Sequence, residues 1–386
     1  MTDSLEAMLA MLLDGAVETL DISPDLQQTA ISRYEDVGTW LAEHGNDWEI
    51  YSQGSFLLGT VVRPATETGE YDIDLVCRTS FRKENITQAQ LKDIVGRELQ
   101  AYRRWKRRVD PEGDRIVMEN NRRCWTFGYP QLGFHLDVLP SILDVDHPPT
   151  GILLTDRKLR SWQHSNPIGY ASWFRTRSRE LETKLRRLAA AANKDVADVP
   201  TWQVRSTLQR VVQVLKWHAM LYFEDDTDNK PPSILLTTLA GLAYRGETDL
   251  FTATRSALAG MPGYIEKRRG RWWVENPAHP GENFTDKWYE YPERRAAFLA
   301  WHEEVSTVLN DLAAMRGQGI DVVVGHMTKA FSPDPIVASA KKYGEQQLAR
   351  RTNGLLGVSS TGLISADAST PLRKHQFYGT DPRPRR

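Results

Sequence analysis

The chain has 386 residues, which is enough for two lobes with a cleft between them. Its 40% hydrophobic and 26% charged residues are ordinary for a globular protein, and a net charge of −1 gives no sign of a nucleic-acid partner. The two cysteines, Cys77 and Cys124, lie far apart and have no metal-ligand spacing. They argue against a disulfide framework and favour inert core thiols in a reducing compartment.

Two helices are expected in the N-terminal part of the chain. Apolar periodicity predicts one over 4–20 with Ser4 as its N-cap, and Pro24 marks the first turn of a second over 24–43. The apolar run over 8–13 is too short to span a membrane, and acids precede it where a signal peptide carries positive charge. We therefore expect a cytoplasmic protein with no membrane partner.

A turn and a short helix are predicted next, over 52–59. A Gly-Ser pair at a helix start, here Gly54 and Ser55, offers backbone N–H groups and a hydroxyl to a phosphate. Gln53 precedes the pair and is expected to orient the turn. Taken alone, a Gly-Ser pair is more often a plain turn, so its significance depends on the acidic residues that come after it in the chain.

Three acids then occur inside apolar strands. Asp72 and Asp74 share one face of a predicted strand because side chains alternate with period two, and Asp137 lies in a second strand. Ile73 and Leu75 give the first strand the character of a core, where charged residues are rare unless they are paired or bound to metal. Three carboxylates suit two Mg²⁺ ions, for which Mn²⁺ can substitute, and such a site predicts nucleotidyl transfer. The alternative, an exposed strand face with solvated acids, fits the apolar neighbours poorly.

The remaining elements fall into two groups. A helix over 86–109 and strands over 116–118, 124–129 and 133–139 complete one sheet, and from about residue 167 the periodicity is helical. Further helices are predicted over 171–193, 201–223, 233–244, 292–315 and 336–351, and the rest of the C-terminal part is expected to be mobile. The fold class is therefore α+β, with a catalytic lobe and its N-terminal helices over 1–165, a helical lobe over 166–330, and a C-terminal helix and tail over 331–386.

The motifs together resemble a known family. Gln53-Gly54-Ser55 within 53–60, Arg63-Pro64, and Tyr71 through Leu75 are similar to the bacterial cGAS/DncV-like nucleotidyltransferases, or CD-NTases. Segments 215–218, 231–238, 276–284 and 375–379 extend the likeness over about 22–379. The resemblance implies a polymerase-β-like catalytic lobe and an oligoadenylate-synthase-like helical lobe, with the active site between them. It also implies synthesis of a cyclic di- or trinucleotide messenger, with release of pyrophosphate, in anti-phage CBASS defence.

The same resemblance assigns roles in the helical lobe. It places Lys216 and Ser233 on the phosphates of the donor nucleotide. A solvated lysine, and a Ser233 N-cap for a helix beginning at Ile234, are the alternatives. Asn276 and Asn283 are expected to fix a turn where the lobes pack rather than to touch substrate.

Partners and alternative functions stay open at this point. The basic residues over 103–108, together with Arg122 and Arg123, are interpreted as a solvated helix face in preference to a nucleic-acid-binding surface. A ubiquitin-transfer-like partner would require trimming after Gly379, and a HORMA-type regulator is equally open. The alternatives to a cyclic product are a linear 2′-5′ oligoadenylate or RNA-tailing transferase and, less favoured, a non-catalytic nucleotide sensor.

Overall fold

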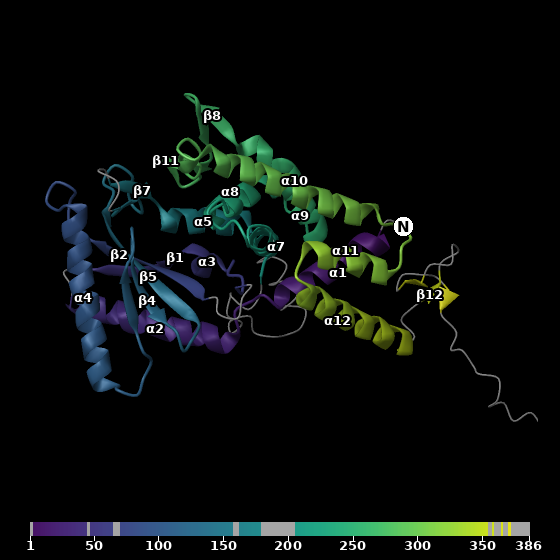
Figure 1. Cartoon of the computed structure of the whole chain (residues 1–386), viewed down its shortest axis with the longest axis horizontal. Coiled ribbons are helices and arrows are strands. Elements are labelled where there is room, and N and C mark those ends of the chain that lie inside the picture. The colour runs from purple at the N-terminus through teal and green to yellow at the C-terminus, as the bar shows by residue number, and fades with distance from the viewer. Residues whose placement is uncertain are drawn as a thin grey trace, which may run out of the picture.

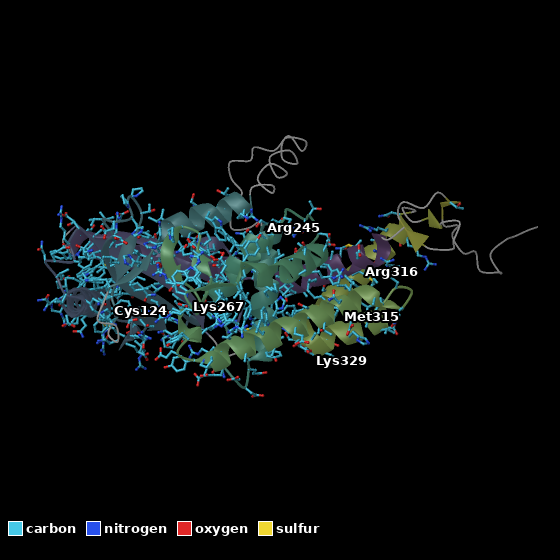
Figure 2. The ribbon with its side chains drawn as sticks, turned by 90° about the horizontal axis from the view of Figure 1, so that it is seen from above. Cys124, Arg245, Lys267, Met315, Arg316 and Lys329 are labelled. Atoms are coloured by element: carbon cyan, nitrogen blue, oxygen red, sulfur yellow. The ribbon has the colours of Figure 1, made fainter. Side chains whose placement is uncertain are left out.

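The computed structural model describes residues 3–44, 47–64, 70–156, 162–178, 205–353, 357–358, 364–365 and 370–371. These residues form a sheet with covering helices at one end of an elongated molecule and a helical part at the other (Figure 1). In the view from above, Cys124 marks the sheet end, and Met315, Arg316 and Lys329 mark the helical end (Figure 2). The α+β class predicted from the sequence is confirmed.

A mixed seven-stranded sheet forms the first part, in the order β1-β2-β5-β4-β3, with β6 on β5 and β7 on β6. Only the central pair, β2 and β5, is parallel, and the other pairs are antiparallel. The strands are β1 (Glu49–Gln53), β2 (Tyr71–Thr79), β3 (Val117–Asn120), β4 (Trp125–Tyr129), β5 (Phe134–Leu143), β6 (Ile152–Leu154) and β7 (Gln163–Ser165). The parallel register sets Asp74 directly opposite Asp137.

Helices α2 (Pro24–His44) and α4 (Gln88–Val109) pack on this sheet and on each other (Figure 1). A capping box begins α4: the Thr87 hydroxyl accepts from the Gln90 amide, and the Gln90 side chain accepts from the Thr87 amide. Apolar residues of both helices and of the inner strand faces form one buried cluster, in which Tyr102 is fully buried. Both helices agree with the sequence prediction to within two residues.

A larger apolar cluster holds the helical part together. Its helices are α5 (Pro167–Arg177), α7 (Thr207–Tyr222), α8 (Ser233–Ala243), α9 (Leu250–Gly260), α10 (Pro292–Ala314), α11 (Ile320–Ala330) and α12 (Pro333–Thr352), with single 3₁₀ turns at Met261–Tyr264 and Asp286–Trp288. Helix α1 (Asp3–Glu18) packs against α12 and α9 and belongs to this cluster through Leu9, Leu12 and Val17. The Ser339 hydroxyl of α12 donates to the carbonyl of Leu12 at 2.8 Å. None of the described helices is long and apolar enough to cross a membrane.

Several expectations need correction. The chain does not stay helical after residue 167, because two hairpins interrupt it: β8 (Glu266–Arg268) with β9 (Arg271–Trp273), and β10 (Glu275–Asn276) with β11 (His279–Asn283). A small sheet of β12 (Gly357–Val358), β13 (Ile364–Ser365) and β14 (Thr370–Pro371) comes after α12. These strands are too short to carry a readable alternation. Helices α9 and α11 were not predicted.

Helix boundaries also shift. Ser4 is not an N-cap, because α1 has already begun at Asp3. The helix predicted over 171–193 begins earlier, at Pro167, where the Asn166 side chain caps the Gly169 amide. Most of the predicted range, residues 179–193, lies outside the described residues, as do 201–204 and 375–379.

Candidate active site

The Gly-Ser turn joins β1 to the five-residue helix α3 (Gly54–Leu58). Gly54 adopts a left-handed backbone with φ +65°, and Gly59 ends the helix in the same region with φ +66°. A Cβ added at Gly54 would overlap Oδ2 of Asp74. The turn therefore needs glycine for two reasons: the backbone conformation and the close approach of the Asp74 carboxylate.

Strands β2 and β5 bring the three predicted acids together. Asp74 and Asp137 are register partners, and Asp72 lies two residues before Asp74 on the same strand face. Burial, together with repulsion from the Asp72 and Asp137 carboxylates, raises the pKa of Asp74 to about 8. A cluster of like charges that resists ionisation in this way fits a divalent cation, since hard oxygen donors are what Mg²⁺ prefers.

Two neighbours of the acids were not predicted from the sequence. His135 lies one strand away from Asp72, with Nε2 at 3.4 Å from Oδ1, and its Nδ1 lies 3.2 Å from Oε2 of Glu70. The hydrogen bond to Asp72 is the main reason why the pKa of His135 rises to about 9. Ligand atoms of Asp72, His135 and Asp137 all lie within 4.8 Å of one another.

Thr126 is the second missed neighbour. Its hydroxyl on β4 donates to Oδ1 of Asp137 and so fixes that carboxylate from the side opposite Asp74. The only sequence signal for Thr126 was its place in a strand beside the one that carries Asp137. Pairing of β4 with β5 turns that position into a contact.

Lys216 comes from the helical part. Its Nζ donates to the carbonyl of Thr60 at 2.8 Å, just after α3, rather than extending freely into solvent. Burial lowers the pKa of Lys216 to about 8, while the Asp72 and Asp74 carboxylates favour its charged form. The structure thus brings this predicted cation from α7 close to the acids of β2.

Ser233 is the other residue proposed from the helical part. It is the first residue of α8, it is exposed, and the N-cap position is Pro232. The alternative in which Ser233 caps a helix beginning at Ile234 is therefore wrong, because the helix starts one residue earlier.

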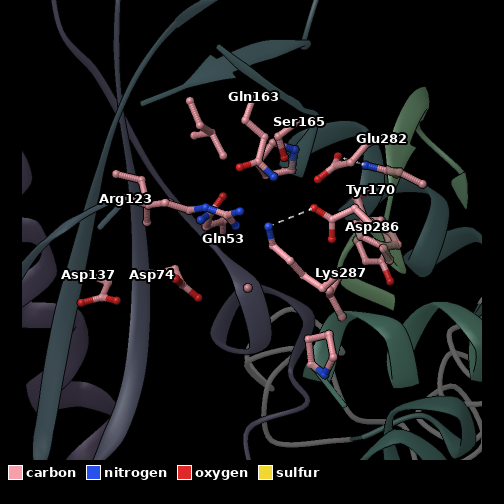
Figure 3. Close-up of a pocket in the computed structure, with 18 of the residues that line it drawn as sticks. Gln53, Asp74, Arg123, Asp137, Gln163, Ser165, Tyr170, Glu282, Asp286 and Lys287 are labelled. Carbon is pink, nitrogen blue, oxygen red and sulfur yellow. Dashed lines mark hydrogen bonds and ion pairs between the residues drawn. The ribbon is translucent and has the colours of Figure 1, made fainter. Parts of the chain in front are cut away.

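A cavity of about 800 Å³ opens between the sheet and the helical part. Four predicted residues line it: Gln53, Gly54, Asp74 and Asp137. As far as the described residues define it, the lining does not include Ser55, Asp72, Lys216 or Ser233. Figure 3 shows Asp74 and Asp137 on neighbouring strands, with Glu282, Asp286 and Lys287 on the opposite side. The volume lies within the range of small-molecule sites.

Basic and acidic side chains that the sequence did not assign also face this cavity. Arg122 and Arg123 donate to the fully buried Asp156 at 2.7 and 3.0 Å and line the cavity. The interpretation as a solvated helix face therefore fails for these two arginines. Arg103 and Arg107 are exposed on α4, so for them the interpretation stays a prediction.

The β10–β11 hairpin forms part of the opposite wall. The side-chain amide of Asn276 donates to Oε2 of Glu282 at 2.7 Å. Oδ1 of Asn283 accepts from the backbone N–H groups of Val274 and Thr285, both at 3.0 Å. These bonds fix the turn, as the sequence predicted, although Asn276 and Asn283 also line the cavity. Burial raises the pKa of Glu282 to about 7.

Comparisons with known proteins agree with this arrangement. Residues 49–140 match the family model described as "Cyclic GMP-AMP synthase DncV-like, nucleotidyltransferase domain". A c-di-GMP synthase of Roseivirga ehrenbergii is 29% identical over 97% of this chain and 97% of its own length. The cyclic dinucleotide synthase CdnG of Bradyrhizobium diazoefficiens is 26% identical over 95% of this chain and 92% of its own.

Solved structures show the same fold. CdnG of B. diazoefficiens in complex with GTP superposes with a TM-score of 0.66 at 24% identity, covering 88% of this chain and 98% of that one. CdnC of E. coli in a complex with a HORMA protein gives 0.60 at 12% identity, covering 84% and 96%. DncV of Vibrio cholerae in its GTP-bound form gives 0.53 at 15% identity, covering 88% and 87%.

Proposed function

We propose that this chain is a cGAS/DncV-like nucleotidyltransferase that joins ribonucleoside triphosphates into a cyclic dinucleotide messenger of anti-phage defence. The observation that carries the proposal is the pairing of Asp74 with Asp137, across the parallel register and beside Gly54, at the wall of a cavity. GTP is the substrate we propose, because the relative from R. ehrenbergii is a c-di-GMP synthase.

The reaction needs an attacking ribose hydroxyl, a donor α-phosphate and a leaving pyrophosphate. We propose that Asp72, Asp74 and Asp137 hold two Mg²⁺ ions, or Mn²⁺ in their place, because their clustered carboxylates supply hard oxygen ligands. When bound, such ions neutralise the charge of the donor phosphates and acidify the attacking hydroxyl.

The protein's own groups position the reactants in this proposal. Gln53, with the amides and hydroxyl of Gly54 and Ser55, would hold the β- or γ-phosphate at the start of α3. Lys216 would exchange its hydrogen bond to the Thr60 carbonyl for one to a phosphate of the donor nucleotide. Ser233 is the second phosphate ligand that we propose from the helical lobe. Ser233 itself is exposed and does not line the cavity, but Pro232 and Ile234 on either side of it do, so the proposed role places Ser233 at the cavity rim.

The same site would act twice. The first attack forms a linear dinucleotide that keeps its own triphosphate, and a second attack by the remaining hydroxyl on that triphosphate closes the ring. Each step releases pyrophosphate and forms one phosphodiester bond, so the protein stores no covalent intermediate. Rate enhancement then comes from orientation and charge stabilisation.

The test is a product analysis. Purified protein is incubated with the four ribonucleoside triphosphates and Mg²⁺, treated with phosphatase and analysed by mass spectrometry. We expect a phosphatase-resistant product at the mass of a cyclic dinucleotide, made from GTP alone and absent in Asp74→Asn. Linear products that phosphatase shortens would instead assign the chain to the oligoadenylate-like or tailing transferases.

Regulation is tested in the same assay. A HORMA-type protein accompanies the related CdnC, and a HORMA-type or ubiquitin-transfer-like regulator of this chain would change the rate when added. Duplex DNA is the control for nucleic-acid activation, and equal rates with and without it would exclude that mode. The proposal places the enzyme in the cytoplasm, where ribonucleoside triphosphates are made and used.

A further inference from the structure

A second cluster of metal-ligating side chains lies outside the catalytic acids. Asp144 comes directly after β5, His147 lies in the turn beyond it, His164 is on β7, and His279 begins β11. One ligand atom from each of the four lies within 4.8 Å of every other. We infer that these residues bind a structural Zn²⁺ ion that ties the catalytic sheet to the β10–β11 hairpin.

The geometry converges on one oxygen. Oδ2 of Asp144 lies 3.0 Å from Nδ1 of His147, 2.6 Å from Nδ1 of His164 and 3.4 Å from Nε2 of His279. Ligands of a tetrahedral zinc ion, with bonds of about 2.0–2.1 Å, are separated by roughly 3.3 Å. The three separations from Asp144 bracket this value, and all four ligand atoms lie within 4.8 Å of one another.

Hydrogen bonding alone does not satisfy the cluster. A carboxylate oxygen has two lone-pair sites, yet three imidazole nitrogens approach Oδ2, and Oδ1 of Asp144 already accepts from the Asp146 amide at 3.2 Å. Nδ1 of the fully buried His279 has no hydrogen-bond partner among the described residues. A cation between the four ligand atoms would resolve this crowding, because the imidazoles would then offer lone pairs instead of protons.

The donor set selects the metal. Three imidazole nitrogens and one carboxylate oxygen suit Zn²⁺ better than Mg²⁺ or Ca²⁺, which prefer oxygen ligands. Four protein ligands leave no open position for substrate, which is the mark of a structural site. Asp144 and His279 have no exposed side-chain surface, whereas His147 and His164 are 40% and 42% exposed and leave one side open for the metal to approach.

The site lies where it can hold the cavity wall. Ser165, the neighbour of His164 in the chain, lines the cavity. So do Glu282 and Asn283, which β11 carries together with His279. The turn that carries Asp144 and His147 is closed by its own backbone bonds, from the Asp144 amide to Gly151 and from the Gly151 amide to His147, both at 2.9 Å. A zinc ion would link this rigid turn to the hairpin through His279.

The experiment measures metal content directly. The full chain carrying Asp74→Asn, which disrupts the catalytic cluster, is purified without a metal-affinity tag, and its zinc is measured by mass spectrometry of the elements. We expect about one zinc per chain. His147→Ala and His164→Ala, at half-exposed positions, should lower this value at least tenfold, and His326→Ala, an exposed histidine of α11, should leave it unchanged.

A cobalt-loaded sample keeps the test decisive if an alanine variant folds poorly. Co²⁺ in place of zinc should give the visible absorption of a tetrahedral site, and His164→Cys should add a sulfur-to-cobalt charge-transfer band. Absence of zinc from the parent, together with failure of the metal-free protein to bind Zn²⁺ or Co²⁺, would overturn the inference. So would zinc that stays bound in His147→Ala and His164→Ala.

Discussion

Gly54 and Asp74 are in such close contact that a Cβ on Gly54 would overlap Oδ2 of Asp74. The residues come from different elements, the start of α3 and the middle of β2. The contact therefore couples the proposed phosphate-binding turn to the proposed metal ligand. Displacing one displaces the other.

Gly54→Ala is expected to lower the rate of nucleotidyl transfer by about a hundredfold, because the catalytic carboxylate must move aside. Gly133→Ala is the matched control. Gly133 also has a positive φ, +70°, but nothing lies within 4 Å of its added Cβ. Both variants should lose about 1–2 kcal/mol of stability from backbone strain, and only Gly54→Ala should lose activity. Initial rates and thermal unfolding measure the two effects, and equal activities would contradict the coupling.

Asp74→Asn is expected to abolish transfer and yet raise the melting temperature in metal-free buffer. It removes one of three mutually repelling carboxylates from a half-buried position. Added Mg²⁺ should raise the melting temperature of the parent through binding to the folded state, and should do so less in the variant. Asp93→Asn, an exposed position on α4, should keep the parent's response to Mg²⁺. An unchanged Mg²⁺ response in Asp74→Asn would argue against this metal site.

Thr126→Val should lower kcat with little change in KM, because the hydroxyl positions Asp137 without reaching the substrate. Loss of one hydrogen bond to a carboxylate is worth about 1.5–3 kcal/mol, or roughly ten- to a hundredfold in rate. Thr126→Ser retains the hydroxyl and should restore most of the activity. If the serine variant were as slow as the valine variant, packing rather than the hydrogen bond would be responsible.

Lys216→Met should raise KM for the donor nucleotide at least about tenfold, since a charge-assisted contact to phosphate would be lost. The substitution preserves the length and apolar stem of the side chain. Lys341→Met, at an exposed position of α12, is the control for loss of one positive charge. Steady-state kinetics with varied GTP separates KM from kcat, and an unchanged KM would remove Lys216 from the phosphate site.

His218 predicts how stability depends on pH. It is buried, its Nδ1 accepts a hydrogen bond from Nε1 of Trp301 at 3.1 Å, and burial lowers its pKa from 6.5 to about 4. Because the unfolded chain binds this proton more tightly, stability is complete above pH 6.5 and falls as the pH drops toward 4, by up to about 3 kcal/mol.

His218→Gln removes the titrating group while keeping an acceptor for Trp301. We expect the unfolding free energy of this variant to vary less with pH between 4 and 6.5. The slope of that free energy against pH should be smaller by up to the contribution of one bound proton. Denaturant unfolding at several pH values measures the difference. Parallel curves for the two proteins would show that His218 does not contribute.

Local patterns account for what the sequence predicted correctly. The strand with Asp72 and Asp74, the helix α4 and the three acids are each visible within a few neighbouring residues. Their residue types alone predicted one metal site, but nothing in a single strand specifies which strand is its partner. The register that sets Asp74 opposite Asp137 is a property of the assembled sheet.

Contacts between distant segments explain what was missed. Thr126 and His135 become neighbours of the acids only through strand pairing. Arg122 and Arg123 belong to a basic run in the sequence, but Asp156, more than thirty residues later, draws both into the cavity wall. The four residues of the proposed zinc site come from three separate segments, and no spacing in the sequence joins His279 to His147.

The packing of α1 against α12 sets the order in which the protein can be completed during synthesis. The buried face of α1 leaves the ribosome early but must wait for α9, and finally for α12, more than three hundred residues later. Until then, Leu12 and Val17 have no finished core to enter. A nascent chain can therefore assemble the sheet that carries the acids while the helical half, which supplies the second wall of the cavity, is still incomplete.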